Sequence, residues 1–322
     1  MPIHNMKKNR IKTSPSPSPE SPDALITWRG ELARPRTLLK RGLALLTPGM
    51  AWFAVFLLIP GLVLIAVSFA GRGEFGELVW EFSADNYKRL AGFGAFGWTS
   101  NYLMIFLRSI KTAFVTTALC VAVSYPLAFF IAARPERTRY FWLTLVIIPF
   151  WTNMVIRAYA WFLILSPDLP FAGIAAFFGL VEPGSPLYPG PLAVYLGMVS
   201  IFLPFTALPI YAVVERLDWE VAEAARDLFA SAPRVFFQAI LPQTLPGLYV
   251  GIILSFAPAM GVFVIPDLLG GAKYMLVGNL IRDQFGAGRD WAFGAAVSMA
   301  LTALSFVGIY FFTRKARGGR QA

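Results

Sequence analysis

The chain has 322 residues, of which 57% are hydrophobic, 15% aromatic and only 14% charged, with a formal net charge of +10. This composition lies outside the range of soluble globular domains and predicts an integral membrane protein. Continuous apolar runs exclude a β-barrel, whose strands alternate over about ten residues. The positive charges lie beside the apolar runs, so we expect them to face anionic lipid headgroups and not nucleic acid.

Residues 1–45 form the first predicted region, a disordered basic tail. Serine and proline alternate from Ser14 to Pro19, and Ser21-Pro22 follow Glu20; this composition cannot build a core. No apolar run follows the basic start directly, so we predict no cleavable signal. The tail is interpreted as a solvated segment, with a recognition arm as the alternative.

Six apolar segments follow, near 49–70, 108–132, 141–165, 191–214, 245–266 and 291–313. Each is long enough to cross a bilayer as a helix, which takes about 20 residues. The prediction is an all-α membrane protein with six transmembrane helices in one domain, residues 46–316, followed by a basic end, 317–322. Prolines inside these segments permit bends for gating or for passive packing.

Lysine and arginine predict the orientation. They gather before the first segment, again at 134–139 and after residue 313, whereas residues 166–190 contain none. The positive-inside rule therefore places both termini in the cytoplasm. The loop at about 215–245 then also lies in the cytoplasm.

Side chains for catalysis are nearly absent. The single histidine, His4, lies in the tail, and the single cysteine, Cys120, lies in the second apolar segment, where it is interpreted as a packing residue. The dipeptide Gly-Lys does not occur, so there is no P-loop. We predict no enzymatic activity and no cofactor or metal bound by this chain; any ATP must be bound by another subunit.

The loop at 215–245 reads as a helix-turn-helix. The first helix has an acidic face, formed by Glu220, Glu223 and Asp227. Beside it lies an apolar stripe, formed by Ala222, Ala225 and Phe229. Ser231 is a predicted N-cap of the second helix, and Leu241-Pro242 and Pro246-Gly247 are predicted to turn the chain into the fifth segment. A pair lying on the membrane is the alternative, but such helices favour basic residues, so the acidic face favours a basic groove of a protein partner.

These residues resemble a known family. Glu223-Ala224-Ala225, then Asp227-Leu228, Ala230-Ser231 and Leu241-Pro242, are similar to the EAA loop of permease subunits of bacterial ABC importers. The resemblance implies a type I (MetI-like) bundle in the bacterial inner membrane. It also implies three kinds of partner: a second permease subunit, two cytoplasmic ATPase subunits, and a periplasmic or lipid-anchored substrate-binding protein. The implied ATPase-docking residues are Glu220, Glu223, Ala224, Ala225, Asp227, Leu228, Phe229 and Ser231.

Further motifs from about residue 50 to 313 resemble the spermidine/putrescine permeases of the PotB type. They are Pro149-Phe150-Trp151-Thr152-Asn153, Ile156-Arg157, Leu217-Asp218, Pro258-Ala259-Met260-Gly261, Asp267-Leu268, Gly270-Gly271-Ala272-Lys273 and Arg289-Asp290-Trp291. The implied substrate is a polyamine or a related small cation. Importers of opines, other amines or phosphonates would share the scaffold.

The chain departs from the EAA pattern at two positions. The family usually has glycine where this chain has Phe229, and valine or isoleucine where it has Ala239. Glycine there suits a left-handed turn, which costs a bulky residue roughly 1 kcal/mol or more. We therefore expect either that the first helix extends further or that Phe229 fills an enlarged pocket in its own ATPase.

Polar groups in the apolar segments indicate a substrate pathway, because each is costly there unless it faces a partner or water. The candidates are Trp151, Thr152, Asn153, Tyr159 and Asp267: aromatic faces can hold ammonium groups, and the carboxylate supplies charge. Arg157 would repel a cation, so it is interpreted as a member of an ion pair or an interfacial anchor. Asn153 has a helix-bridging alternative, and Asp267 a loop-capping one.

The segment 273–289 is predicted to be external. It is either a surface for the binding protein, carrying Asn279, Arg282, Asp283 and Gln284, or a re-entrant gate. An ATP-independent secondary transporter is the competing function, and it would be expected to carry carboxylates in mid-span. The six segments contain no such Asp or Glu, and an EAA loop has no role in that mechanism.

Overall fold

A computed structural model describes residues 45–73, 76–94, 97–177, 179, 182, 185–271 and 274–318. The chain divides into two units, 1–62 and 63–322. The predicted tail 1–45 lies outside the described residues except for Leu45, and so do the last four residues of the predicted basic end.

The first span is the helix Leu45–Ser68. It contains a π-helical turn, η1 (Ala54–Leu58), and α3 (Ile59–Ser68). The π turn ends two residues before Pro60, which has no N–H to donate to the preceding turn. A wider turn at this point lets the helix continue through the proline.

Short hairpins and a helix follow the first span. β1 (Gly71–Arg72) pairs antiparallel with β2 (Leu78–Val79), with Gly71 opposite Val79. After α4 (Asp85–Leu90), β3 (Phe93–Gly94) pairs antiparallel with β4 (Gly97–Trp98). The sequence analysis predicted no strands in this connection.

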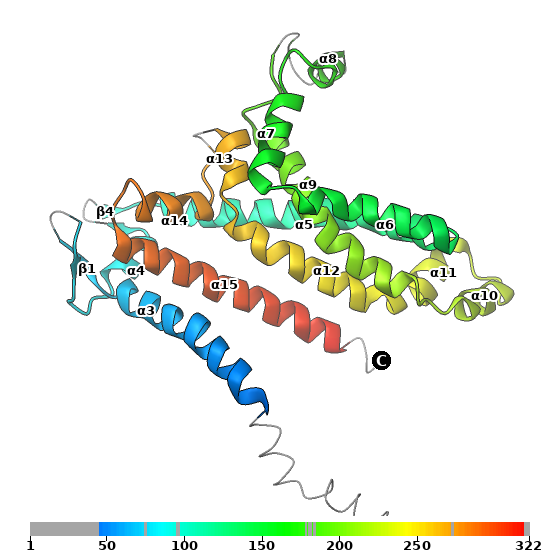
Figure 1. Ribbon diagram of the computed structural model, residues 1–322, viewed down its shortest axis with the longest axis horizontal. Helices are drawn as coiled ribbons and strands as arrows, with labels where there is room; N and C mark the ends of the chain where they lie inside the picture. Colours follow the sequence, from blue (N-terminus) through cyan, green and yellow to red (C-terminus); the bar gives the residue numbers. More distant parts are fainter. Residues whose placement is uncertain are drawn as a thin grey trace, which may run out of the picture. The chain divides into compact units, whose positions relative to one another are not determined.

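Four long helices run side by side in Figure 1: α5 (Asn101–Ala132), α9 (Pro191–Val214), α12 (Leu241–Gly261) and α15 (Trp291–Gly318). Glycine allows α9 and α12 to approach closely. A Cβ on Gly247 would lie 2.5 Å from the carbonyl oxygen of Pro209. The backbones therefore touch where a larger residue would separate them.

The third predicted span is broken, which corrects the expectation of one continuous helix over 141–165. α6 (Glu136–Trp151) and α7 (Met154–Ile164) meet at an angle of 97°. Thr152 is extended, and the side chain of Asn153 accepts a hydrogen bond from the N–H of Val155 at 2.8 Å. Asn153 thus caps α7, and among the described residues its side chain makes no hydrogen bond to another helix. α8 (Pro170–Phe177) follows α7.

The fifth span begins earlier than predicted. α10 (Trp219–Asp227) precedes it, and α11 (Ala232–Val235), the π turn η2 (Phe236–Ile240) and α12 then form one 30-residue helix. The predicted turns at Leu241-Pro242 and Pro246-Gly247 are wrong, because the π turn before Pro242 accommodates the proline without ending the helix. The helix ends at Gly261, five residues before the predicted end at 266.

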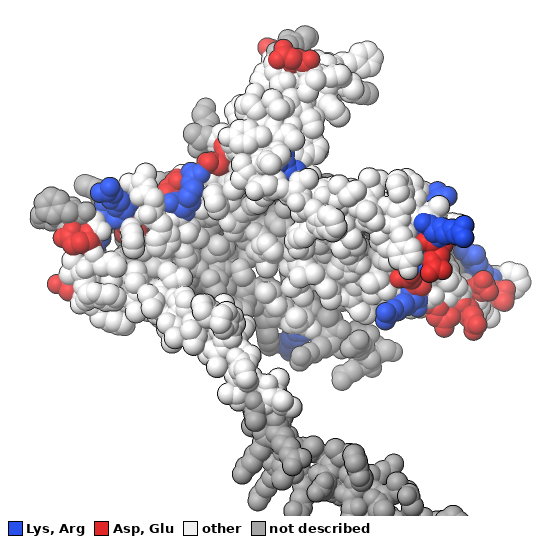
Figure 2. Space-filling model, in the orientation of Figure 1, with Lys and Arg blue, Asp and Glu red and all other residues white. Residues whose placement is uncertain are grey.

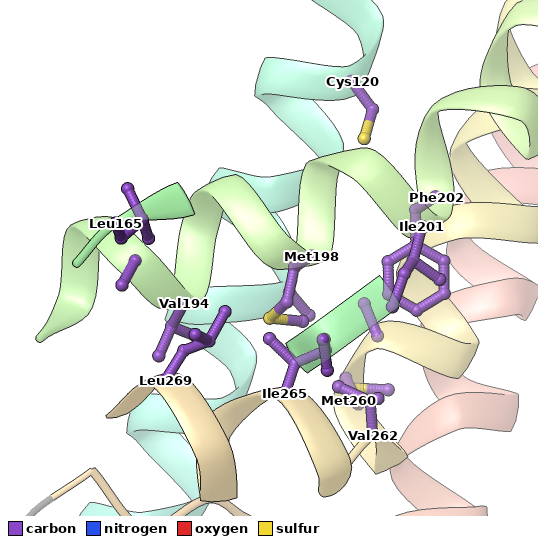
Figure 3. Close-up of a cluster of buried hydrophobic side chains, with 14 residues drawn as sticks. Cys120, Leu165, Val194, Met198, Ile201, Phe202, Met260, Val262, Ile265 and Leu269 are labelled. Carbon is purple, nitrogen blue, oxygen red and sulfur yellow. The ribbon is translucent and has the colours of Figure 1, made fainter. Parts of the chain in front are cut away.

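Two short helices follow that end, α13 (Val264–Gly270) and α14 (Val277–Phe285). The main core cluster joins α13 to the long helices. In Figure 3, Val194 and Met198 of α9 face Leu269 and Ile265 of α13, and all four are buried. Cys120 is also fully buried in this cluster, as its interpretation as a packing residue predicted.

The described residues contain five helices that are long and apolar enough to span a membrane, or six with the bent pair counted as one span. Within residues 63–322, charged side chains gather at the end near α10 and α11 and at the end near α4 and α14 (Figure 2). The surface between these ends is almost entirely uncharged in this view. The predicted all-α membrane fold is confirmed.

Candidate functional site

The helix α10 presents the predicted acidic face to solvent. The Asp218 side chain caps its start by accepting the N–H of Glu220 at 3.0 Å. Glu220, Glu223 and Asp227 are all exposed, and Ala224 lies exposed beside them. The carboxylates are therefore available to a basic partner surface.

Phe229 lies at the end of α10 in a left-handed conformation, with φ 58°. Its N–H donates to the carbonyl of Arg226 at 2.8 Å, and the N–H of Ala230 donates to the carbonyl of Ala225 at 3.2 Å. These two bonds form a Schellman motif, a helix end that usually has glycine at the position of Phe229. The expectation that the helix extends past this residue is wrong, because α10 ends at Asp227.

The side chain of Phe229 is 98% exposed, and that of Leu228 is 82% exposed. Phe229 therefore does not belong to the apolar stripe with Ala222 and Ala225. A bulky side chain is thus held in a costly backbone conformation without burial in its own chain.

The inner face of α10 packs within the chain. Ala222 is buried in a cluster with Leu217, Val235, Ala239 and Ile240, and Ala225 packs against this cluster. Ser231 occupies the N-cap position of α11, but its side chain makes no capping hydrogen bond. Ala225 therefore supports the helix from within, whereas Ser231 is exposed.

Two polar contacts join helices at the end of the molecule near α10, and neither was predicted from the sequence. Gln243 of α12 accepts the N–H of Asp218 at 3.1 Å and donates to its carbonyl at 3.3 Å. Arg139 of α6 pairs with Glu215, next to the end of α9, at 2.7 Å. The start of α10 is thus hydrogen-bonded directly to α12.

A cavity of about 460 Å³ lies between the bent α6–α7 pair and the end of α12. The α6–α7 break lines one side and the break between α12 and α13 the other, and α7 lies beside α13 (Figure 1). The lining residues are Phe150, Thr152, Met154, Arg157, Ile201, Phe202, Phe205, Pro258, Gly261, Val262, Phe263 and Val264. Interrupted spans around a cavity are a common construction of transporter substrate sites.

The structure brings only part of the predicted pathway set to this cavity. Of that set Thr152 lines it and Asp267 does not, whereas Arg157, which was interpreted as an ion-pair member or anchor, does line it. Trp151, which is 82% exposed, and the exposed residues Asn153 and Tyr159 lie outside the lining of this cavity.

Arg157 is held by backbone carbonyls. Its Nη2 donates to Thr152 at 3.0 Å, and its Nη1 to Ser200 at 3.5 Å. The Ser200 hydroxyl also accepts the indole N–H of Trp161 at 2.8 Å. Across the described ranges no carboxylate lies within ion-pair distance of Arg157, so the predicted ion pair is not formed within that part of the chain.

Asp267 is paired with Arg282, which also binds Asp283 at 2.8 Å. The hydrogen bond with Asp267, and then that with Asp283, raises the pKa of Arg282. Asn279 is buried and donates to the carbonyl of Phe263 at 3.1 Å. Asn279 therefore does not belong to the exposed surface predicted for 273–289, whereas Arg282 is exposed.

A buried carboxylate at the α4 end was not singled out as a site residue. Asp290 is 1% exposed and pairs with Arg89 at 2.6 Å and Arg72 at 3.5 Å. It also accepts the N–H of Phe293 at 3.1 Å, and Arg89 lies 4.1 Å from the centre of the Phe293 ring. The signal in the sequence is an aspartate directly before an apolar helical run, which predicts an N-cap.

Within the part of the chain that the structure describes, no group of three or more His, Cys, Asp or Glu side chains forms a metal site.

Comparison with known proteins gives consistent matches. Residues 124–317 match the family described as "Binding-protein-dependent transport system inner membrane component". The chain is 38% identical over 268 residues to "Spermidine/putrescine transport system permease protein PotB" of Salmonella typhimurium (strain SL1344), covering 83% of this chain and 91% of that protein.

Two solved chains share the fold. One comes from a crystal structure of a bacterial ABC transporter involved in the import of the acidic polysaccharide alginate, with a TM-score of 0.63 at 17% identity over 88% of this chain and 97% of that chain. The other comes from a bacterial alginate ABC transporter in complex with an alginate pentasaccharide-bound periplasmic protein, with a TM-score of 0.62 at 16% identity over 88% and 96%.

Proposed function

Because this chain belongs to the family of binding-protein-dependent transport system inner membrane components, we propose that it forms one half of the substrate pathway of an ATP-driven polyamine importer. It is a multi-pass membrane protein with the fold of an ABC importer permease. The exposed acidic face of α10 is the observation that carries the proposal, because it suits a basic groove of an ATPase subunit better than it suits a membrane surface. Spermidine and putrescine are the proposed substrates, on the strength of the relatives' names.

Both termini and α10 lie in the cytoplasm in this proposal, as the distribution of Lys and Arg indicates. Two ATPase subunits dock on the permease pair, one of them on α10 of this chain. Their contacts are Glu220, Glu223, Ala224, Asp227, Leu228, Phe229 and Ser231, with Ala225 supporting the helix from inside. Phe229 enters an apolar pocket of the cognate ATPase, which offsets the strain of its backbone.

ATP-driven movement reaches the pathway through the long fifth span. The Gln243 contacts tie the start of α10 to α12, and the opposite end of α12 reaches the cavity at Gly261 and Val262. A rigid helix thus joins the ATPase contact to the break in the pathway. A second permease subunit closes the pathway, and a periplasmic or lipid-anchored binding protein delivers the substrate. Trp151 and Tyr159 offer exposed aromatic faces for ammonium groups.

Reconstitution of both permease subunits, the ATPase and the binding protein in liposomes tests the coupling. Glu223→Ala is expected to leave the permease in the membrane but to reduce ATPase co-purification and ATP-dependent spermidine uptake. Glu136→Ala, which removes another exposed carboxylate at the start of α6, is the control and is expected to behave like the unaltered chain. Unchanged co-purification and uptake in the Glu223 variant would contradict the docking role.

Calorimetric titration of the binding protein with spermidine and putrescine tests the substrate. Binding of either is expected. An importer for an opine, another amine or a phosphonate would use the same scaffold, and absence of polyamine binding would favour that alternative.

A further inference from the structure

The cavity at the two helix breaks carries one charge. Arg157 is the charged residue among those that line it, and Thr152 is the other polar side chain there; the remaining lining residues are apolar. A guanidinium in such surroundings is costly unless backbone carbonyls, water or an opposite charge compensates it, and an opposite charge compensates it most directly.

The contacts of Arg157 within the described residues supply dipoles and no negative charge. Two of its five N–H groups donate to the carbonyls of Thr152 and Ser200. Its Nε is buried without a hydrogen-bond partner in that part of the chain. Each terminal nitrogen keeps a second N–H, so the half-buried guanidinium retains donors for an incoming acceptor.

Asp267, the acidic candidate from the sequence, already has an ion-pair partner. Asp267 pairs with Arg282, so it does not neutralise Arg157. A polyamine carries only positive charge and would be repelled. At the α6–α7 bend, Trp151 at the end of α6 is 82% exposed and Ile156 of α7 is 67% exposed, so apolar side chains at the bend are available to another subunit.

We infer that the cavity is a carboxylate-binding site and that an Asp or Glu side chain of the second permease subunit occupies it. Arg157 binds that carboxylate through its free terminal N–H groups, in the geometry that suits guanidinium and carboxylate. The pairing fixes the two subunits at the α6–α7 break and removes the repulsion that Arg157 would exert on a cationic substrate. The inference rests on the proposed heterodimeric importer.

Charge reversal in the complete importer tests the inference. Arg157→Glu is expected to reduce recovery of the second permease subunit at least fivefold on purification in detergent, and to reduce spermidine uptake at least tenfold. Arg137→Glu, at an exposed position near the start of α6, is the matched control and is expected to change neither. Membrane levels of each variant separate loss of pairing from loss of folding.

A second set of variants identifies the partner group. In the Arg157→Glu background, each Asp or Glu in the apolar spans of the second subunit is changed to Arg in turn. One of these changes is expected to restore both pairing and uptake. Failure of every reversal, or unaltered pairing and uptake in Arg157→Gln, would overturn the inference.

The substrate itself is the other source of a carboxylate. If the unaltered importer takes up ornithine, a carboxylate-bearing amine, and Arg157→Gln abolishes that uptake while the two subunits still co-purify, the site serves a substrate carboxylate and the inference is wrong. If the unaltered importer takes up no polyamine, the proposed substrate is wrong. The inferred pairing of Arg157 is still tested in that case, because subunit pairing is measured separately.

Discussion

Gln243 binds both backbone groups of Asp218, accepting its N–H at 3.1 Å and donating to its carbonyl at 3.3 Å. It also donates to the carbonyl of Ala239, one turn earlier in its own helix, at 3.0 Å. One side chain therefore fixes the N-cap of α10 to the long fifth span. The link lies between the proposed ATPase contact and the cavity.

We expect Gln243→Ala to uncouple ATP hydrolysis from transport. The variant loses two contacts to Asp218, each worth about 1 kcal/mol net, so α10 is held to the fifth span by apolar packing without these polar links. The ratio of spermidine imported to ATP hydrolysed in liposomes is expected to fall while the ATPase remains bound. Gln238→Ala, an exposed glutamine on η2, is the control. An unchanged ratio in the Gln243 variant would count against this route of coupling.

Phe229 is expected to contribute to ATPase binding through its side chain. Phe229→Gly relieves a backbone strain of roughly 1 kcal/mol or more but gives the unfolded chain more freedom, so stability is expected to be unchanged or higher by up to about 1 kcal/mol. Phe229→Ala removes the ring but keeps the strain. Both variants are expected to bind the cognate ATPase more weakly. Thermal unfolding measures the change in stability, and co-purification measures ATPase binding. Normal ATPase binding by both variants would show that Phe229 does not enter a pocket of the ATPase.

Asp290 is expected to stabilise the connection between α4 and α15. Asp290→Asn keeps an acceptor for the N–H of Phe293 but leaves Arg89 and Arg72 without their carboxylate. Because the two arginine side chains are 39% and 47% exposed, solvent screens part of the loss, and we expect a cost of about 2 kcal/mol. Thermal unfolding in detergent measures it. Asp85→Asn, which alters an exposed pair with Lys88, is expected to leave the midpoint unchanged.

Close contact between α9 and α12 is expected to depend on Gly247. In Gly247→Ala the new Cβ would meet the carbonyl oxygen of Pro209 at 2.5 Å and Cγ2 of Val213 at 2.7 Å, so the helices must separate. We expect a destabilisation of about 1–3 kcal/mol, as for overpacked cores. Gly173→Ala in α8 adds a methyl group to open space and is the matched control. Equal unfolding midpoints for the two variants would show that the contact is dispensable.

Local patterns in the sequence were enough to predict the membrane class, the apolar segments and the exposed acidic face of α10. Hydropathy and helical period depend only on neighbouring residues, which is why these features could be predicted. Phe229 was also identified as an irregular position, because the family that the loop resembles usually has glycine there.

The same local patterns did not predict the paths of the third and fifth spans. Continuous apolar runs look alike whether the helix is straight or bent, so neither the 97° bend before Asn153 nor the end of the helix at Gly261 could be read from them. Pro242 suggested a turn, but a π turn takes up the proline and the helix continues.

Long-range partners were decided only by the tertiary structure. Arg89 and Asp290 are 201 residues apart, and no periodicity in either segment indicates that they meet. Arg157 is visible in the sequence as a charge in an apolar run, but its carbonyl partners and its place in a cavity between two broken helices depend on how the spans pack. Hydropathy determined which segments enter the membrane, and packing determined which side chains meet there.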